Sequence, residues 1–314
     1  MSTNSRFPAL NAFLFGQPED FFVRFAELEV AQVPLRNTFL AFRANIQSAI
    51  TVANMPYVIA HTAILDSRFQ QLHSAESIRG LAKSSAGAGL TDEAKSDALS
   101  AARSRMDMEM ADPDIIKKHA ESTLNLLDRH LKEEKFAAAS QDLLRQVLVM
   151  SWSAFEVFAN DILREIMNAN PKLISRFADV KPYKEVLSPR LFLEAMSGRN
   201  YDLSSAMGDI FCDAVRLDSI EKIRDALAIA VGDPTLEEQL KDTRIWLLFQ
   251  QRNLIVHRRG IKDARFLSRT TDNGTLGEQI LLNGDYIDSL LELVRDIGCA
   301  LYSAVLDKFY PATD

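Results

Sequence analysis

The chain has 314 residues and a mass of 35.2 kDa, with 36 basic and 43 acidic side chains and a formal net charge of −7. That length has room for two domains of roughly 150 residues, each with its own core. An apolar share of 47 % with 25 % charged residues is typical of a folded, soluble protein and excludes a disordered chain. The acidity disfavours indiscriminate binding to nucleic acid, so any such contact requires a local basic patch.

Glycine and proline are sparse, at 12 and 10 residues in the whole chain, which favours long helices over a sandwich or barrel. Cys212 and Cys299 lie far apart and have no CxxC or Cys/His spacing, so we predict neither a disulfide scaffold nor a structural zinc site. The sequence contains no metal-ligand cluster, and we expect no metal and no cofactor. The first residues lack the apolar core of a signal peptide, and the longest nearly apolar stretch, 297–306, covers about half a membrane span. These features predict a cytoplasmic protein that has no membrane contact.

The first part of the chain is predicted to be helical, because its apolar residues recur every three or four positions. The segments expected there are two or three helices in 19–73 broken at Pro34 and Pro56, a loop at 80–91, and helices at 91–110 and 114–131. Asp112 is the expected N-cap of the last of these helices. We place a domain boundary near residue 135, so that 1–135 form an N-terminal helical region with a sensor, partner or dimerisation role.

Residues 136–314 are predicted to form one helical bundle domain. The segments expected there are a long helix at 139–168, shorter helices at 189–196 and 203–229, a helix at 234–259 capped by Asp233 and ended by Gly260, strands at 266–271 and 278–282 around Asp272-Asn273-Gly274, and a final helix capped by Asp285. The predicted fold class is therefore all-α, with a small β-hairpin before the last helix.

One charged residue interrupts the apolar face of the helix at 234–259. Ile245, Leu248 and Phe249 belong to a stripe that predicts a core residue at position 252, where the chain has Arg252. A buried guanidinium without a partner would cost several kcal/mol, so this side chain must be paired or used in function. Glu156, which interrupts the apolar face of the helix at 139–168, is a candidate partner.

Asn253 and His257 lie four residues apart, so their side chains stand one turn above the other on an adjacent face of the same helix. Arg252 and His257 are about 140° apart around an ideal helix. They cannot converge on one small target unless the helix end unwinds or a second copy of the chain completes the site.

This helix end also carries the local basic patch that nucleic-acid binding would require. Residues 241–265 contain seven basic side chains against two acidic ones, in a chain that is acidic overall. The residues of this patch that are candidates for binding nucleic-acid phosphates are Arg244, Arg258, Arg259 and Lys262.

Arg252-Asn253, followed after three residues by His257 and then by Arg-Arg-Gly, resembles the Arg-x4–6-His signature of HEPN-domain proteins. The stretch SWSAFEVFANDIL, within the helix at 139–168, similarly resembles the first bundle helix of the RNase L-like and defence-associated branch of that family. The resemblance covers about residues 137–312. It implies a HEPN-like bundle in the C-terminal half and leaves the N-terminal half without a counterpart.

The resemblance further implies a metal-independent endoribonuclease that acts as a homodimer, with Arg252, Asn253 and His257 as catalytic residues at a shared cleft. His257 would move a proton on the attacking 2′-OH or the leaving 5′-oxygen, and Arg252 would stabilise charge on the phosphate. Asn253 would orient His257 or the phosphate. A toxin or phage-defence effector, held in check by an antitoxin or another regulatory partner, is the implied role.

The alternative is a non-catalytic helical module that binds RNA, a nucleotide or a protein. In that case Arg252 pairs structurally with Glu156, and His257 caps the helix end. RNA cleavage in excess chelator discriminates between the two hypotheses.

Overall fold

The computed structural model describes residues 7–13, 19–29, 33–83, 91–181, 183–187, 193–194, 196–202 and 205–311. The chain divides into two compact units. The first unit comprises Met1–Phe15 and Ala53–Gln141, and the second comprises Gly16–Val52 and Asp142–Asp314. This division differs from a single boundary near residue 135, because Gly16–Val52 belongs with the C-terminal part of the chain.

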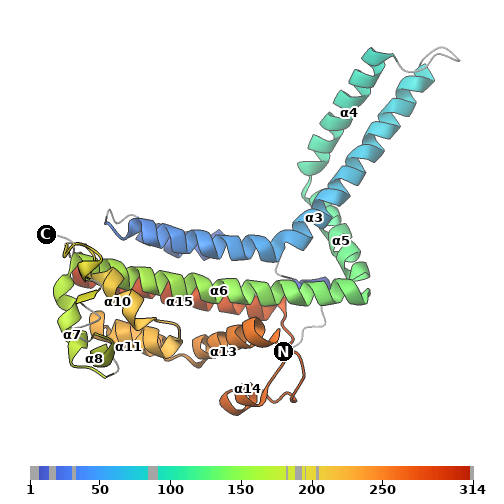
Figure 1. The fold of residues 1–314 in the computed structure, drawn as a ribbon. Helices are drawn as coiled ribbons and strands as arrows, with labels where there is room; N and C mark the ends of the chain where they lie inside the picture. The colour runs from blue at the N-terminus through green and yellow to red at the C-terminus, as the bar shows by residue number, and fades with distance from the viewer. Residues whose placement is uncertain are drawn as a thin grey trace. The chain divides into compact units, whose positions relative to one another are not determined.

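The first unit is a set of helices (Figure 1) and has a small apolar core. Its elements are α1 (Ala9–Ala12), the part of α3 (Arg36–Lys83) from Ala53 onward, α4 (Asp92–Met110), α5 (Pro113–His130) and the beginning of α6 (Glu134–Ala169). Phe13, Ala60 and Leu127 bury their side chains in one cluster. Asp112 accepts a hydrogen bond from the backbone of Asp114 at 2.9 Å, which confirms the predicted N-cap.

Ion pairs join α3 to α4 in the first unit. Arg68 donates to both carboxylate oxygens of Glu109, at 2.9 and 2.6 Å, and Arg105 on α4 pairs with Glu76 on α3 at 2.7 Å. Bidentate arginine pairs fix orientation better than single contacts do. These pairs therefore supplement an interface with few large apolar residues.

The second unit contains the remaining helices (Figure 1). They are η1 (Glu19–Phe22), α2 (Val23–Leu28), α3 up to Val52, α6 from Asp142, η2 (Pro171–Ile174), α7 (Ser175–Ala178), α8 (Tyr183–Val186), α10 (Met207–Val215), α11 (Ile220–Ala230), α12 (Pro234–Gln239), α13 (Thr243–Arg258), α14 (Ala264–Arg269) and α15 (Gly284–Phe309). α15 contacts α2, α12 and α13, and α11 contacts α12 and α13. The described part of the chain is therefore all-α.

Aromatic rings form the centre of the second unit's core. Phe39 stacks on Tyr302 with ring centroids 4.1 Å apart, and Phe42 stacks on Phe158 at 4.4 Å. All four side chains are buried. These contacts join α3, α6 and α15, which explains why Gly16–Val52 belongs to this unit.

Two proline predictions have different outcomes. α3 begins at Arg36, shortly after Pro34, as expected. Pro56 lies inside α3 and does not end it, so the break predicted there is wrong. Proline removes one backbone donor and crowds the preceding turn, and the long helix tolerates that local loss.

The helix predicted at 234–259 is two helices. Asp233 caps α12 by accepting from the backbone N–H of Leu236 at 2.7 Å, as expected, but α12 ends at Gln239. Asp242 then caps α13, so a second capping residue restarts the chain. The final helix is capped by Asn283 rather than by Asp285.

The predicted β-hairpin is absent from the described residues, and this is a correction to the predicted fold class. Residues 264–269 form α14, because Asp263 accepts a hydrogen bond from the Phe266 N–H at 2.7 Å and starts a helix there. The antiparallel contact in this region is a single isolated bridge between Ile261 and Gln279. Residues 278–282 therefore do not form the strand pair that the sequence predicts.

α3 contains a longer uncharged stretch than the one identified from the sequence. Residues 44–65 of this helix contain no Asp, Glu, Lys or Arg, so this uncharged run is longer than 297–306. By length and composition, α3 is long and apolar enough to cross a membrane, and 22 % of its most apolar window is buried. Its first part buries Phe39, Phe42 and Ile46, as a core helix does.

Cys212 and Cys299 are both free and buried.

Gly298 tests the packing of α3 on α15. A Cβ atom at this position would lie 2.3 Å from the Phe42 ring, so we expect Gly298→Ala to lower the free energy of unfolding by about 1–3 kcal/mol. Urea denaturation measures the change. Combining Gly298→Ala with Phe42→Leu should cost less than the sum of the single variants, since the smaller side chain relieves the clash. Additive losses would contradict this packing.

Candidate functional site

The site is built on α13, which is fixed at both ends. At its beginning, the Asp242 carboxylate accepts a backbone hydrogen bond at 2.8 Å. At its end, Arg259 adopts a left-handed conformation with φ of 56°, and the Gly260 N–H donates to the Leu254 carbonyl at 3.2 Å. The Arg259 N–H donates to the Ile255 carbonyl at 2.9 Å, as in the αL type of helix ending, and arginine takes the position usually held by glycine. The directions of the side chains in the last turn are therefore set by the backbone.

Arg252 faces α6. Its Nη2 lies 3.6 Å from Oε2 of Glu156, and the two side chains are 24 % and 21 % exposed. Trp152 Nε1 donates to the same carboxylate oxygen at 2.9 Å, and Arg252 Nη1 donates to Oδ1 of Asn253 at 2.9 Å. The pairing considered from sequence is thus present, and it connects the α6 carboxylate to Asn253 through one guanidinium.

Burial raises the pKa of the Glu156 carboxyl above its ordinary value, while the Arg252 charge and the Trp152 hydrogen bond oppose that rise. A carboxyl whose pKa is raised by folding binds its proton more tightly in the native state. Its contribution to stability is therefore greatest at low pH and declines as the pH rises through that raised pKa. Arg252 limits this loss at neutral pH.

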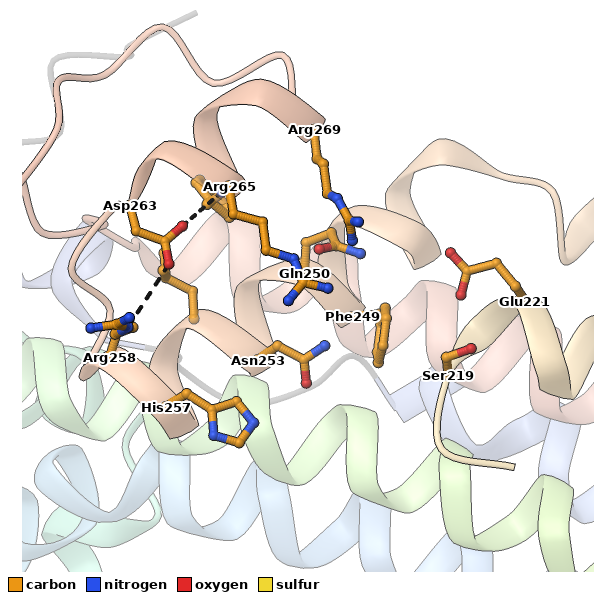
Figure 2. Close-up of a pocket in the computed structure, with 12 residues that line it drawn as sticks. Ser219, Glu221, Phe249, Gln250, Asn253, His257, Arg258, Asp263, Arg265 and Arg269 are labelled. Carbon is orange, nitrogen blue, oxygen red and sulfur yellow. Dashed lines mark hydrogen bonds and ion pairs between the residues drawn. The ribbon is translucent and has the colours of Figure 1, made fainter. Parts of the chain in front are cut away.

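A pocket of about 690 Å³ lies on the adjacent face of α13, between α11, α13 and α14. Gln250, Asn253 and His257 line it from α13, as Figure 2 shows. Asn253 and His257 share this face, in agreement with their four-residue spacing. Arg252 is not among the lining residues, so within one copy of the chain the described structure does not bring Arg252 and His257 to one target.

α14 supplies positive charge to the opposite wall of the pocket. Arg265 and Arg269 are four residues apart on this helix, are exposed, and extend toward α13 in Figure 2. Neither forms an ion pair in the described part of the chain. Guanidinium groups with free donors are suited to phosphate oxygens. The pocket therefore combines an imidazole, two amides and unpaired arginines.

The four predicted RNA-binding residues are placed differently from one another. Arg258 lines the pocket and its Nε lies 3.9 Å from Asp263. Arg244 pairs with Asp242 at 2.6 Å and does not line the pocket. Arg259, although exposed, also lies outside the pocket lining, where it ends the helix.

Lys262, the fourth of these residues, is buried. Its Nζ lies 2.8 Å from Asp272 and 3.5 Å from Glu278, and the hydrogen bond to Asp272 raises the pKa of the lysine. These contacts hold the segment that follows α14 against the end of α13. Lys262 thus stabilises the local fold, and its ammonium group is not presented to the pocket.

Arg265 belongs to the basic patch of the sequence, whereas Arg269 lies in the predicted strand at 266–271 and is not among the predicted site residues. The sequence did contain the relevant signal, since Asp263 precedes Phe266 by the three residues expected of a helix cap. A helix there places the two arginines on one face. Glu221 and Gln250 also line the pocket, and no local motif pointed to them.

Among the residues that the structure describes, no group of three or more His, Cys, Asp or Glu side chains could hold a metal ion. Comparison with protein-family models, with curated proteins and with solved structures finds no match. The functional conclusion therefore depends on the geometry of the α13 site itself.

Replacing Arg252 with Met tests its electrostatic role. We expect a loss of about 1–3 kcal/mol in unfolding free energy at pH 7.5, because the half-buried Glu156 carboxylate loses its charged partner. The loss should be smaller at pH 5, since without the guanidinium the pKa of Glu156 rises further and the carboxyl takes up a proton. Thermal denaturation across this range measures the effect. The Glu156→Gln background is the control, because there Arg252→Met should lower the free energy of unfolding by the same amount at pH 5 and pH 7.5. An equal loss at the two pH values with Glu156 present would contradict the account.

Proposed function

We propose that this protein is a metal-independent endoribonuclease of HEPN type, with the pocket between α13 and α14 as its RNA-cleaving site. The observation that carries the proposal is the position of His257 and Asn253 in one pocket opposite the unpaired Arg265 and Arg269. A proton-transfer group beside phosphate-binding cations is the set of groups that cleavage by a ribose 2′-OH requires.

In the proposed reaction, the 2′-oxygen attacks the adjacent phosphorus and the bond from phosphorus to the 5′-oxygen breaks. The 2′-OH gives up its proton to a base, and the leaving 5′-oxygen receives a proton from an acid. The products are a 2′,3′-cyclic phosphate and a 5′-hydroxyl. His257 provides one of these proton transfers, and the arginines of α14 bind the phosphate charge.

Arg252 acts as a positioning residue in this proposal. It donates to the side-chain Oδ1 of Asn253 and is held by Glu156, so it fixes the amide that stands one turn before His257. An amide with its oxygen occupied presents its N–H groups to the pocket. Asn253 would then donate to a phosphate oxygen.

A homodimer would complete the proton transfers. Among the described residues, His257 is the one imidazole that lines the pocket, whereas the reaction uses both an acid and a base. A second copy would supply the other histidine. We further propose that the protein acts in the cytoplasm as a toxin or defence effector, with an antitoxin or other regulatory partner and with a sensing role for the N-terminal helices.

The second candidate is a module that binds RNA or a nucleotide without cleaving it. The Arg252–Glu156 pair favours this candidate, since it leaves the motif arginine engaged in a structural contact. In this case the pocket binds phosphate through α14 but performs no chemistry.

Cleavage of labelled single-stranded RNA in excess chelator tests the proposed activity. We expect wild-type protein to yield cyclic-phosphate and 5′-hydroxyl ends, and His257→Ala to lower the rate at least about 100-fold, because it removes a proton-transfer group. His130→Ala, which removes an exposed histidine paired with Glu133, is the matched control and should cleave at the wild-type rate. Intact RNA with the wild type, or equal rates for both variants, would make the enzymatic proposal wrong.

The arginines of α14 predict a specific salt dependence of RNA binding. If Arg265 and Arg269 each contact one phosphate, replacing both with Ala should reduce the slope of log affinity against log salt by about 1.4. Binding titrations at several salt concentrations measure it. Replacing the exposed Arg103 and Arg129 of the first unit removes the same charge and should leave the slope unchanged. Equal changes in both double variants would contradict the assignment of phosphate contacts to α14.

A further inference from the structure

The pocket contains a carboxylate that phosphate binding does not explain. Asp263 and Glu221 both line the pocket. Asp263 has two local roles, since it caps α14 at 2.7 Å and lies 3.9 Å from the Arg258 guanidinium. Glu221 accepts a hydrogen bond from the neutral indole N–H of Trp246 at 3.2 Å and forms no ion pair in the described part of the chain. A carboxylate of this kind repels phosphate and attracts a ligand group that carries N–H donors.

The geometry points to a nucleobase subsite at Glu221 that selects guanine, and we propose that the ligand's base binds there while its phosphate binds near His257 and the α14 arginines. This inference deepens the proposed function and rests on it only in placing RNA in the pocket. In Figure 2, Glu221 enters the pocket from the α11 side, whereas His257 lies at the other end of the lining. The volume of about 690 Å³ has room for a nucleotide in this orientation.

Guanine fits a carboxylate better than the other three bases do. Its N1–H and N2–H donors are adjacent and parallel, so each can donate to one oxygen of the Glu221 carboxylate. Adenine and cytosine present one amino group beside a ring nitrogen acceptor, which would face the second carboxylate oxygen. Uracil presents one N–H between two carbonyl oxygens. In single-stranded RNA this edge of the base is free to be bound.

The neighbours of Glu221 supply the remaining contacts for a purine. Gln250 lines the same pocket and offers N–H donors to the guanine O6 acceptor. Phe249 provides an apolar surface for the ring, and it is itself fixed by Trp152, with ring centroids 5.0 Å apart. The subsite thus gathers the kinds of group that guanine recognition uses, namely a pair of acceptors, amide donors and the edge of an aromatic ring.

Glu221→Gln is a clean test of this inference. The amide oxygen of the replacement can still accept the Trp246 N–H, so the local fold is kept, but one acceptor becomes a donor that opposes the guanine N–H groups. Glu238→Gln makes the same charge change at an exposed residue on α12 that pairs with Lys241 at 3.6 Å, and it is the control. Thermal denaturation verifies that both variants are folded.

The probes are the 3′-monophosphates of guanosine, adenosine, cytidine and uridine, titrated by calorimetry and by the fluorescence of Trp246 beside Glu221. We expect wild type and Glu238→Gln to bind the guanosine nucleotide about tenfold or more tightly than the others, and Glu221→Gln to lose that preference. Equal binding of the four nucleotides by wild type, no binding at all, or an unchanged preference in Glu221→Gln would overturn the subsite.

The binding result is separable from the proposed activity. Selective binding without RNA cleavage would support the guanine subsite and contradict the ribonuclease. Cleavage at all four bases, with equal binding of the four nucleotides, would support the ribonuclease and overturn the subsite. If both hold, cleavage by wild-type protein should be selective for guanosine next to the scissile phosphate, and Glu221→Gln should reduce that selectivity more than it reduces the overall rate.

Discussion

The candidate site depends on the angular register of α13. Successive residues of an α-helix are about 100° apart, so Arg252 and Asn253 cannot point in the same direction, whereas Asn253 and His257 must. Asp242 begins this helix, and the left-handed Arg259 ends it. The register consequently divides the polar group into two faces. The arginine is held by α6 and the other two side chains line a pocket, with one hydrogen bond from Arg252 to Asn253 connecting the faces.

This arrangement makes charge the main difference between the two faces. On the α6 side, the Arg252 guanidinium forms an ion pair with Glu156, whose carboxyl pKa is raised by burial, so the two opposite charges largely offset each other. On the pocket side, α14 presents two arginines without ion pairs in the described residues, opposite the Glu221 carboxylate, which accepts a hydrogen bond from an indole. A nucleotide has both an anionic phosphate and a base with N–H donors. The proposed ribonuclease site and the proposed guanine subsite are therefore two consequences of one charge distribution.

The sequence predicted the features that depend on apolar periodicity and residue spacing. It did not predict those that depend on the helix cap at Asp263 or on tertiary packing. Apolar periodicity predicted the helical class, and residue spacing placed Asn253 and His257 together. The prediction of a strand at 266–271 is wrong because Asp263 caps a helix there, and that helix places Arg269 on the same face as Arg265. Glu221 lies on α11, so only tertiary packing brings it to α13. The sequence predicts Lys262 to be a residue of the basic patch, but in the structure it is buried and forms ion pairs with Asp272 and Glu278.

The central claim is that an RNA phosphate binds between His257 and the arginines of α14. A crystal structure of the protein with a dinucleotide that has guanosine on the 5′ side and a 2′-deoxy sugar at that position tests it most directly, since the analogue lacks the attacking hydroxyl. The account predicts the phosphate within hydrogen-bond distance of His257 and of at least one α14 arginine, with the guanine edge on Glu221. A dinucleotide bound outside this pocket, or a phosphate contacted by neither His257 nor α14, would contradict the account.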